Sequence, residues 1–163
     1  MADDDRQGAD DKVVLGISNV RSFAAALHCI RAGNKQICTI SISSSGVSVV
    51  WEDESKAMQG SVFFKPELFA RFHCSADVRH EFGIQLQLLL DTLAVFASAA
   101  APMTAHYPGP QGELVCEMTD AAAGGGGNGG PSQRLGSLAV GGGGGPGSVC
   151  TWARIVCLQA ETV

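Results

Sequence analysis

The segment Arg79–Ser98, RHEFGIQLQLLLDTLAVFAS, most strongly limits what this chain can fold into, because its hydrophobic period changes partway along. In its first half, Phe82 and Ile84 alternate with other residues, which is the pattern of a strand with one buried face. From Leu86 onward the apolar residues recur at three- and four-residue steps, which is the stripe of a helix. The stripe consists of Leu86, Leu89, Leu90, Leu93, Phe96 and Ala97. Such a helix needs a sheet to cover, so the segment predicts a mixed fold.

A second helix is predicted near the start of the chain. The apolar run Val13–Ile17 predicts a short strand, and Ser18 or Asn19 can cap the helix that follows. The pair Gly33-Asn34 is a typical end signal, so we expect this helix to reach Arg31 or Ala32. Its core stripe comprises Val20, Phe23, Ala24, Leu27 and Ile30. A different face has a small, basic stripe made of Arg21, Ala25, His28 and Arg31 or Ala32.

The remaining patterned segments predict strands. Gln36–Ile42 and Gly46–Trp51 flank three serines and form the clearest hairpin in the sequence. Further strands are expected over Lys56–Phe64, around Phe72, and over Met103–Tyr107, Leu114–Met118 and Ser148–Leu158. We expect the last two to pair as an antiparallel hairpin with a lengthened connection, since loop closure costs grow slowly with length. The order predicts an α+β fold in which two helices cover one face of a mainly antiparallel, curved sheet.

Two segments are expected to lie outside this fold. Residues 1–12 contain five aspartates and predict a disordered acidic tail. Residues 121–147 are rich in glycine and cannot bury enough apolar surface to offset the entropy of ordering, which predicts a flexible insertion. The folded domain is therefore expected to span residues 13–158.

Composition excludes several kinds of protein. The net charge of −5 gives no general excess that favours nucleic acid or a membrane. The six cysteines include no CxxC pair, which argues against zinc and against a disulfide framework. Buried reduced thiols in a nuclear or cytosolic protein are the interpretation we favour.

Catalytic motifs are also missing from the sequence. The acids Glu52, Asp53 and Glu54 form a charged turn, Asp91 stands alone on its helix, and the histidines show no metal-ligand spacing. The glycine tract lacks the GK[ST] of a phosphate loop, and no GxSxG elbow occurs. We therefore expect no catalytic residue, no metal site and no cofactor.

Two segments of the sequence resemble a known protein family. They are SNVRSFAAALHCIRAGNKQICTISISSSGVSVVWED, and FKPELFARFHC followed by EFGIQLQLLLDTLAVFAS. Together they resemble the N-terminal domain of DNA sliding clamps with the PCNA-like fold, and most of all the Rad-one subunit of the heterotrimeric DNA-damage checkpoint clamp. The resemblance covers Val13–Ala100 and returns more weakly in the last two strands. Clamp subunits have two such domains. Because the resemblance covers the first of them, we expect this chain to contain the N-terminal domain only.

The resemblance implies a function and its partners. A clamp subunit forms a ring with two other clamp-like subunits, is placed on double-stranded DNA by a clamp loader without regard to sequence, and recruits checkpoint signalling and repair proteins in the nucleus. The alternative that the family suggests is a 3′→5′ exonuclease, which needs several carboxylates around metal ions. Glu52, Asp53 and Asp91 are the acids to replace in a test of that alternative.

The resemblance also implies two kinds of site. Helices line the hole of the ring, so Arg21, His28 and Arg31 are expected to face DNA phosphates, with weak contact because the second helix has no lysine or arginine. The strand at a subunit edge is expected to be Leu114, Val115, Cys116, Glu117 and Met118, which would complete a continuous sheet with a neighbouring subunit.

Overall fold

The computed structural model describes residues 12–98, 101–120 and 149–160, and the acidic tail and the glycine-rich insertion lie outside these ranges. The elements of the described residues follow in chain order: β1 (Val13–Ile17), α2 (Val20–His28), β2 (Ile37–Ser43), β3 (Gly46–Glu52), β4 (Gln59–Phe64), the 3-10 turn η1 (Pro66–Leu68), β5 (Arg71–His73), β6 (His80–Gln85), α3 (Leu86–Ser98), β7 (Met103–Tyr107), β8 (Leu114–Asp120), β9 (Val149–Ile155) and β10 (Leu158–Gln159).

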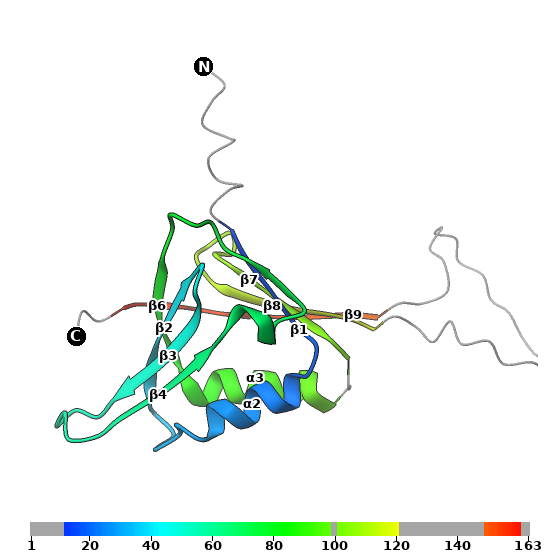
Figure 1. The fold of residues 1–163 in the computed structure, drawn as a ribbon. Coiled ribbons are helices and arrows are strands. Elements are labelled where there is room, and N and C mark those ends of the chain that lie inside the picture. Colours follow the sequence, from blue (N-terminus) through cyan, green and yellow to red (C-terminus); the bar gives the residue numbers. More distant parts are fainter. Residues whose placement is uncertain (1–11, 99–100, 121–148, 161–163) are drawn as a thin grey trace, which may run out of the picture.

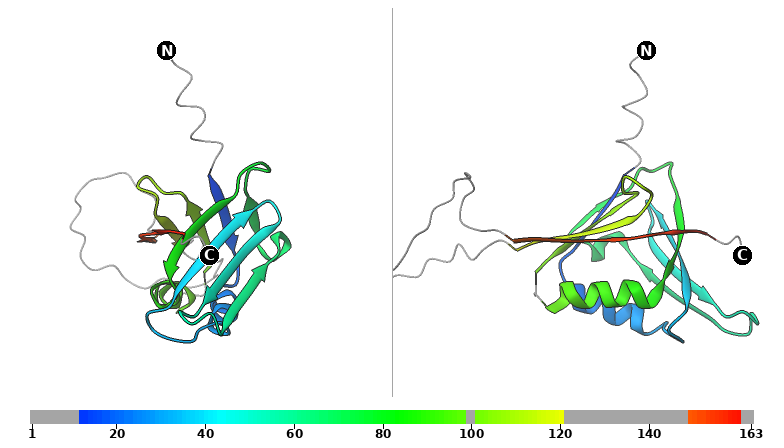
Figure 2. Two further views of the ribbon diagram at one scale, coloured as in Figure 1. Left: turned by 90° about the vertical axis from the view of Figure 1, so that its left-hand side faces the viewer. Right: turned by 180° about the vertical axis from the view of Figure 1, so that it is seen from behind.

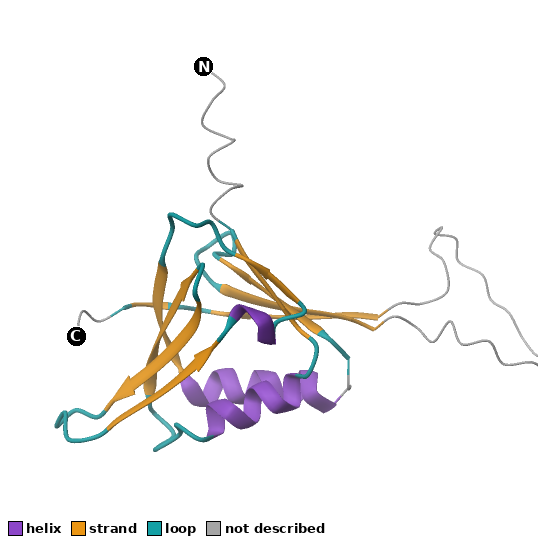
Figure 3. Ribbon diagram, in the orientation of Figure 1, coloured by secondary structure: helices purple, strands orange, loops and turns teal. Residues whose placement is uncertain are grey.

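The strands form two five-stranded sheets that lean together as the sides of a wedge, and the two helices close its base (Figure 1). One sheet has the order β5-β1-β7-β8-β9 and the other has the order β10-β6-β2-β3-β4. Every pairing between neighbouring strands is antiparallel. The α+β prediction is confirmed, with the expected curved sheet divided into two. Figure 3 shows both helices on the same side of the strands.

The hydrophobic core lies between the two sheets and the helix pair. In β2 the side chains of Cys38, Ile40 and Ile42 are buried while their neighbours are not, as the alternation predicts. The helix α3 buries five stripe residues, namely Leu86, Leu89, Leu90, Leu93 and Phe96. Each buried leucine or phenylalanine contributes about 1.5–3 kcal/mol relative to an exposed one, so the two periodic patterns direct the packing.

The helix α2 begins as predicted and ends earlier than predicted. The Asn19 side chain accepts a hydrogen bond from the Ser22 amide at 2.9 Å, which caps the first turn. The expectation that the helix reaches Arg31 is wrong, because α2 ends at His28. The loop that follows is held by Gln36, whose side chain accepts from the Ala32 amide at 2.6 Å and donates to the Ile30 carbonyl at 2.9 Å. These bonds satisfy backbone groups that a longer helix would otherwise use.

The segment predicted as one strand, Ser148–Leu158, is divided between the two sheets. Its first part, β9, pairs with β8, whose first residue Leu114 lies opposite Ile155. No residue of β8 remains beyond that point, and the chain continues to β10, which pairs with β6. Leu158 lies over Gly83 there, and a β-carbon on Gly83 would be 3.3 Å from that of Leu158. Figure 2 shows this segment crossing the molecule from one sheet to the other.

An aromatic stack joins the two sheets where they meet. Tyr107 of β7 stacks on Phe82 of β6 with ring centroids 4.0 Å apart, and His80 meets the Tyr107 ring edge-on at 5.6 Å. The Nε2 atom of His80 is buried and has no hydrogen-bond partner among the described residues. A buried polar atom without a partner is destabilising, so this position is not optimised for stability.

Replacing His80 with phenylalanine should therefore raise the free energy of unfolding by about 1 kcal/mol, since the ring contact is kept and the orphan nitrogen is removed. Urea denaturation followed by circular dichroism measures the change. The matched control is H106F, because Nε2 of His106 lies 3.7 Å from a carboxylate oxygen of Glu117 and its loss should bring no gain. A stability decrease in H80F would contradict the expectation.

Among the described residues, no helix has the length and apolar character that a membrane crossing requires.

Candidate nucleic-acid interface and subunit edge

The exposed side of α2 displays two of the three predicted DNA-facing residues. Arg21 and His28 are both exposed and are seven positions apart. This spacing places them on the same side of the helix, separated by about 10 Å of rise. The two helices run in opposite directions and are in contact, so the end of α2 lies beside the start of α3 (Figure 1).

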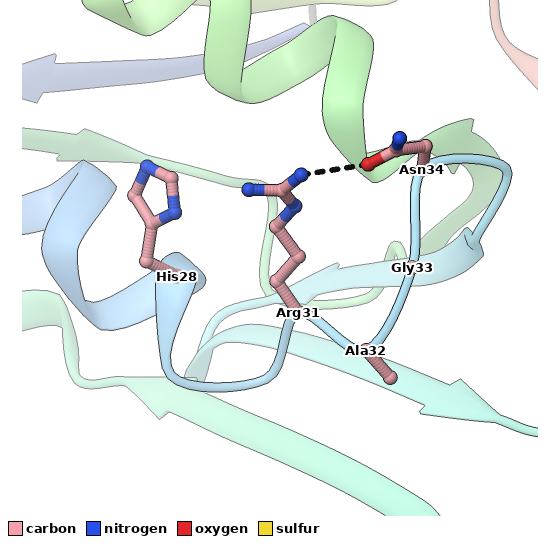
Figure 4. Close-up of a pocket in the computed structure, with 5 residues that line it drawn as sticks. All are labelled: His28, Arg31, Ala32, Gly33 and Asn34. Carbon is pink, nitrogen blue, oxygen red and sulfur yellow. Dashed lines mark hydrogen bonds between the residues drawn. The ribbon is translucent and has the colours of Figure 1, made fainter.

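Arg31 lies in the loop after α2 and not on the helix, yet it remains close to His28. His28, Arg31, Ala32, Gly33 and Asn34 line an open hollow of ≈ 290 Å³ (Figure 4). The Nη2 group of Arg31 donates a hydrogen bond to Oδ1 of Asn34 at 2.7 Å, which holds the guanidinium beside the hollow. The structure thus brings His28 and Arg31 together and leaves Arg21 two turns away.

The loop is tied to the start of α3, and this affects the local field. The Gln85 side chain donates to the Asn34 carbonyl at 3.1 Å, and the Leu86 amide donates to the Gln36 carbonyl at 2.9 Å. The negative end of the α2 dipole and the positive end of the α3 dipole therefore meet here and oppose each other. The positive charge of the Arg31 guanidinium therefore decides the sign of the potential here.

The exposed face of α3 offers no cation. It consists of Leu88, Asp91, Ala94, Val95 and Ser98. Oδ1 of Asp91 accepts a hydrogen bond from Gln87 at 2.7 Å, which fixes the carboxylate on this face. Of the two helices and the described loop between residues 29 and 36, only α2 and that loop therefore have basic side chains.

The predicted subunit-edge strand is wrong in its position. Leu114, Val115, Cys116, Glu117 and Met118 all belong to β8, which lies inside its sheet with β7 on one side and β9 on the other. Leu114, Cys116 and Met118 are buried, which suits an interior strand. Among the described strands, the two edges of this sheet are β5 and β9, and β9 is the strand that the sequence predicted as the partner of β8.

The edge strand β9 exposes two large side chains. The Trp152 ring is 59% exposed and has the Arg154 guanidinium 4.9 Å from its centroid. The Nε atom of Arg154 lies 3.8 Å from a carboxylate oxygen of the buried Glu113. An exposed tryptophan on an open strand edge is a feature of interaction surfaces. The sequence contained this signal in the alternation of Trp152 and Arg154, but gave no way to see which strand lay outermost.

The acids of the β3–β4 turn have a local structural role. The Asp53 carboxylate accepts hydrogen bonds from the Ser55 hydroxyl and from the Met58 amide, the latter at 2.8 Å. These bonds favour the charged form and lower the pKa of Asp53. Within the described ranges, no group of three or more histidine, cysteine, aspartate or glutamate side chains could hold a metal ion.

The cysteines differ sharply in exposure. Burial raises the pKa of Cys38 from 9.0 to about 11, opposed by a hydrogen bond from Gln36. Burial, with Cys157 nearby, raises the pKa of Cys116 to about 12. Cys29 and Cys150 are exposed. Because the folded state holds the thiol protons of Cys38 and Cys116 more tightly, the stability they provide is fully present below pH 9 and is lost as the pH rises toward 11–12.

A thiol reagent at pH 8 should accordingly modify Cys29 and Cys150 rapidly and should modify Cys38 and Cys116 only when the protein unfolds, since only the thiolate reacts. Mass spectrometry of timed samples gives the order of modification. Rapid modification of Cys116 in the folded protein would contradict the packing of β8 between β7 and β9.

Comparisons with known proteins agree with this geometry. The family model described as "Repair protein Rad1/Rec1/Rad17" matches residues 14–124, more than half of the chain. A crystal structure of PCNA from Thermococcus kodakaraensis is similar in fold, with a TM-score of 0.62 and 13% sequence identity over 93% of this chain and 48% of that chain. The chain thus spans about half the length of that PCNA. No curated protein matches the sequence significantly. The family match over two thirds of the length, together with the clamp architecture, shows that this chain belongs to the Rad1/Rec1/Rad17 repair protein family and has the PCNA-like fold.

Proposed function

We propose that this chain is a non-catalytic subunit of a ring-shaped DNA-damage checkpoint clamp that encircles double-stranded DNA in the nucleus. In this proposal two other clamp-like subunits complete the ring, a clamp loader places it on DNA, and the assembled ring recruits checkpoint signalling and repair proteins. The family membership and the clamp fold support the proposal at the level of a clamp subunit. The clamp loader, the recruited proteins and the nuclear location are inferred from the role of a clamp subunit and belong to the proposal.

The observation that supports DNA contact most directly is the placement of the basic residues. Arg21 and His28 lie on the exposed side of α2, and Arg31 lies just beyond it, on the face of the wedge that the helices form. Phosphate contacts by arginine are independent of sequence and weaken with salt. The α3 face presents Asp91 and no cation, so contact with a duplex is expected to be one-sided and weak.

Replacing both Arg21 and Arg31 with alanine should weaken binding of the chain to a labelled DNA duplex and should reduce the dependence of affinity on salt. Each lost phosphate contact lowers the slope of log affinity against log salt by about 0.9, so the double variant should lose about 1.8. Fluorescence anisotropy between about 50 and 200 mM salt measures both quantities.

The control for this experiment is R79A. Arg79 is exposed and pairs with Glu81 at 3.4 Å, and it directly precedes the end of β6 that lies away from the helices (Figure 1). Its loss removes the same charge and should leave the salt slope nearly unchanged. Equal slopes for the wild type, the double variant and the control would contradict DNA contact through α2.

The assembly part of the proposal depends on β9. A ring subunit must meet its neighbour through a surface that differs from the one its other neighbour uses. Among the described strands β9 pairs only with β8, so its outer edge can offer backbone groups to a strand of an adjacent subunit. Strand addition of this kind gives affinity through main-chain hydrogen bonds. The proposed interface therefore lies on β9, and not on β8, which the sequence predicted as the subunit edge.

A further inference from the structure

The hydrophobic core contains a small cavity where the two sheets and the two helices face one another. Its volume is ≈ 40 Å³, and both sheets and both helices contribute side chains to its wall, all of them apolar apart from the Cys116 thiol. All of the lining residues are buried except Phe23, which is half-buried. The cavity therefore lies in the interior, away from the exposed side of α2 and from the edge strand β9.

The cavity exists because one row of the sheet that contains β7 has short side chains facing the core. Ala105 lies in β7, the middle strand, with Leu15 of β1 opposite it on one side and Cys116 of β8 on the other. Cys116 in turn lies opposite Ala153 of β9. The middle of this row is therefore shallow, whereas Met103, two positions earlier in β7, has a long side chain.

The opposite wall is held in place by strand pairing. Ile40 of β2 lies between Phe82 of β6 and Val49 of β3, and the main-chain hydrogen bonds of this ladder keep the three side chains at their positions. Leu89 and Leu93 of α3 complete the wall. Voids larger than a water molecule are few in protein interiors, and the atoms that line one lose dispersion contacts. A guest that restores these contacts is favoured.

We infer that this cavity is a binding site for one small uncharged apolar molecule, with a xenon atom as the experimental probe. The volume exceeds the roughly 10–15 Å³ that a single water-sized guest occupies, so the space is sufficient. Water itself does not suit the site, because an ordered water needs about two to four polar partners and the lining side chains offer only the Cys116 thiol. A charged or polar guest would lose its hydration and gain no hydrogen bonds in return.

The small size of the guest limits its affinity. The best very small ligands gain a bounded free energy for each non-hydrogen atom, which gives a single xenon atom a dissociation constant on the order of 0.1 M. Occupancy therefore requires xenon under pressure. Because the unfolded chain has no such cavity, binding also stabilises the folded state by mass action.

The test uses the whole 163-residue chain in carbon–proton correlation NMR spectra of its methyl groups under increasing xenon pressure, with helium at the same pressures as the control. Methyl resonances of Leu89, Leu93 and Ile40 should shift along a curve that bends toward saturation. Those of Leu68 and Val95, which are 64% and 59% exposed, should not. No xenon-specific shifts, or equal shifts in the lining and the exposed methyl groups, would overturn the inference.

Replacing Ala105 with valine tests where the guest binds. The added methyl carbons should fill the cavity, abolish the xenon-dependent shifts and raise the melting temperature measured by circular dichroism. A153V is the matched control, because it places the same substitution in the same row at a residue that does not line the cavity, and it should keep the xenon-dependent shifts. A folded A105V protein that takes up xenon as the wild type does would contradict the inference.

A larger cavity provides a second measurement that does not depend on how well A105V packs. L93A extends the cavity toward the roughly 150 Å³ at which an apolar cavity takes up benzene. Benzene should raise the melting temperature of L93A and should leave those of the wild type and of L88A unchanged, since Leu88 lies on the exposed side of the same helix. The absence of a benzene-dependent rise in L93A would overturn the inference. Each of these outcomes leaves the salt experiment with Arg21 and Arg31 unaffected.

Discussion

Replacing Leu93 with alanine should lower the free energy of unfolding by about 3 kcal/mol, which is a large part of the stability of a domain of this size. Leu93 is 0% exposed and lies on the face of α3 that closes the core between the two sheets. Truncating its side chain reduces the buried apolar surface and leaves a cavity that the surrounding strands can only partly fill. Urea denaturation at equilibrium measures the loss.

The matched control is L88A on the same helix. Leu88 is 46% exposed, so the same substitution removes much less buried surface and should change stability by about 0.5 kcal/mol or less. Both positions have similar helix propensity effects, which therefore cancel in the comparison. Equal losses at the two positions would show that the stripe of α3 does not face the core as the structure places it.

The sequence predicted the parts of the fold that depend on local periodicity. The strand Val13–Ile17, the strand Met103–Tyr107 and the helix beginning at Leu86 have the predicted positions. In each, one face is buried against a continuous core, and the alternation of apolar residues follows directly from that burial. The hairpin of β2 and β3 is confirmed as well, with Ser43 opposite Gly46.

The errors occur where a single side-chain contact or a strand pairing decides the outcome. The end of α2 depends on Gln36, which is eight residues beyond His28 and satisfies the loop amides with its side chain. The division of the last strand depends on where β8 begins and on the space above Gly83. Neither signal is periodic, so a pattern in the sequence could not reveal it.

The sequence predicted only part of the candidate site, because helix spacing places some of its residues while loop contacts and strand order place the others. Arg21 and His28 share a helix face because of their spacing, which the sequence states directly. Arg31 joins His28 through the loop and through its bond to Asn34, which helix spacing did not anticipate. The identity of the edge strand depends on strand order, which is a property of the whole sheet. Trp152 was therefore missed although its exposure makes it the more informative residue.

A substitution at Gly46 should be almost as damaging as one in the core. Gly46 opens β3 with φ of +138°, a backbone conformation that residues with a side chain rarely adopt. A β-carbon there would lie 2.4 Å from the Phe64 carbonyl oxygen and 2.9 Å from the Phe63 ring. Alanine must therefore either strain the backbone or push β4 away from β3, and we expect G46A to cost about 3 kcal/mol.

Gly33 is the control that separates the close approach at Gly46 from the general effect of replacing a glycine with alanine. A β-carbon at Gly33 would meet no atom within 4 Å, so G33A should be neutral or stabilising by about 0.5 kcal/mol through the entropy of the unfolded chain. Chemical denaturation of both variants provides the comparison. A G46A protein as stable as the wild type would show that β4 does not approach the β2–β3 turn as closely as the structure places it.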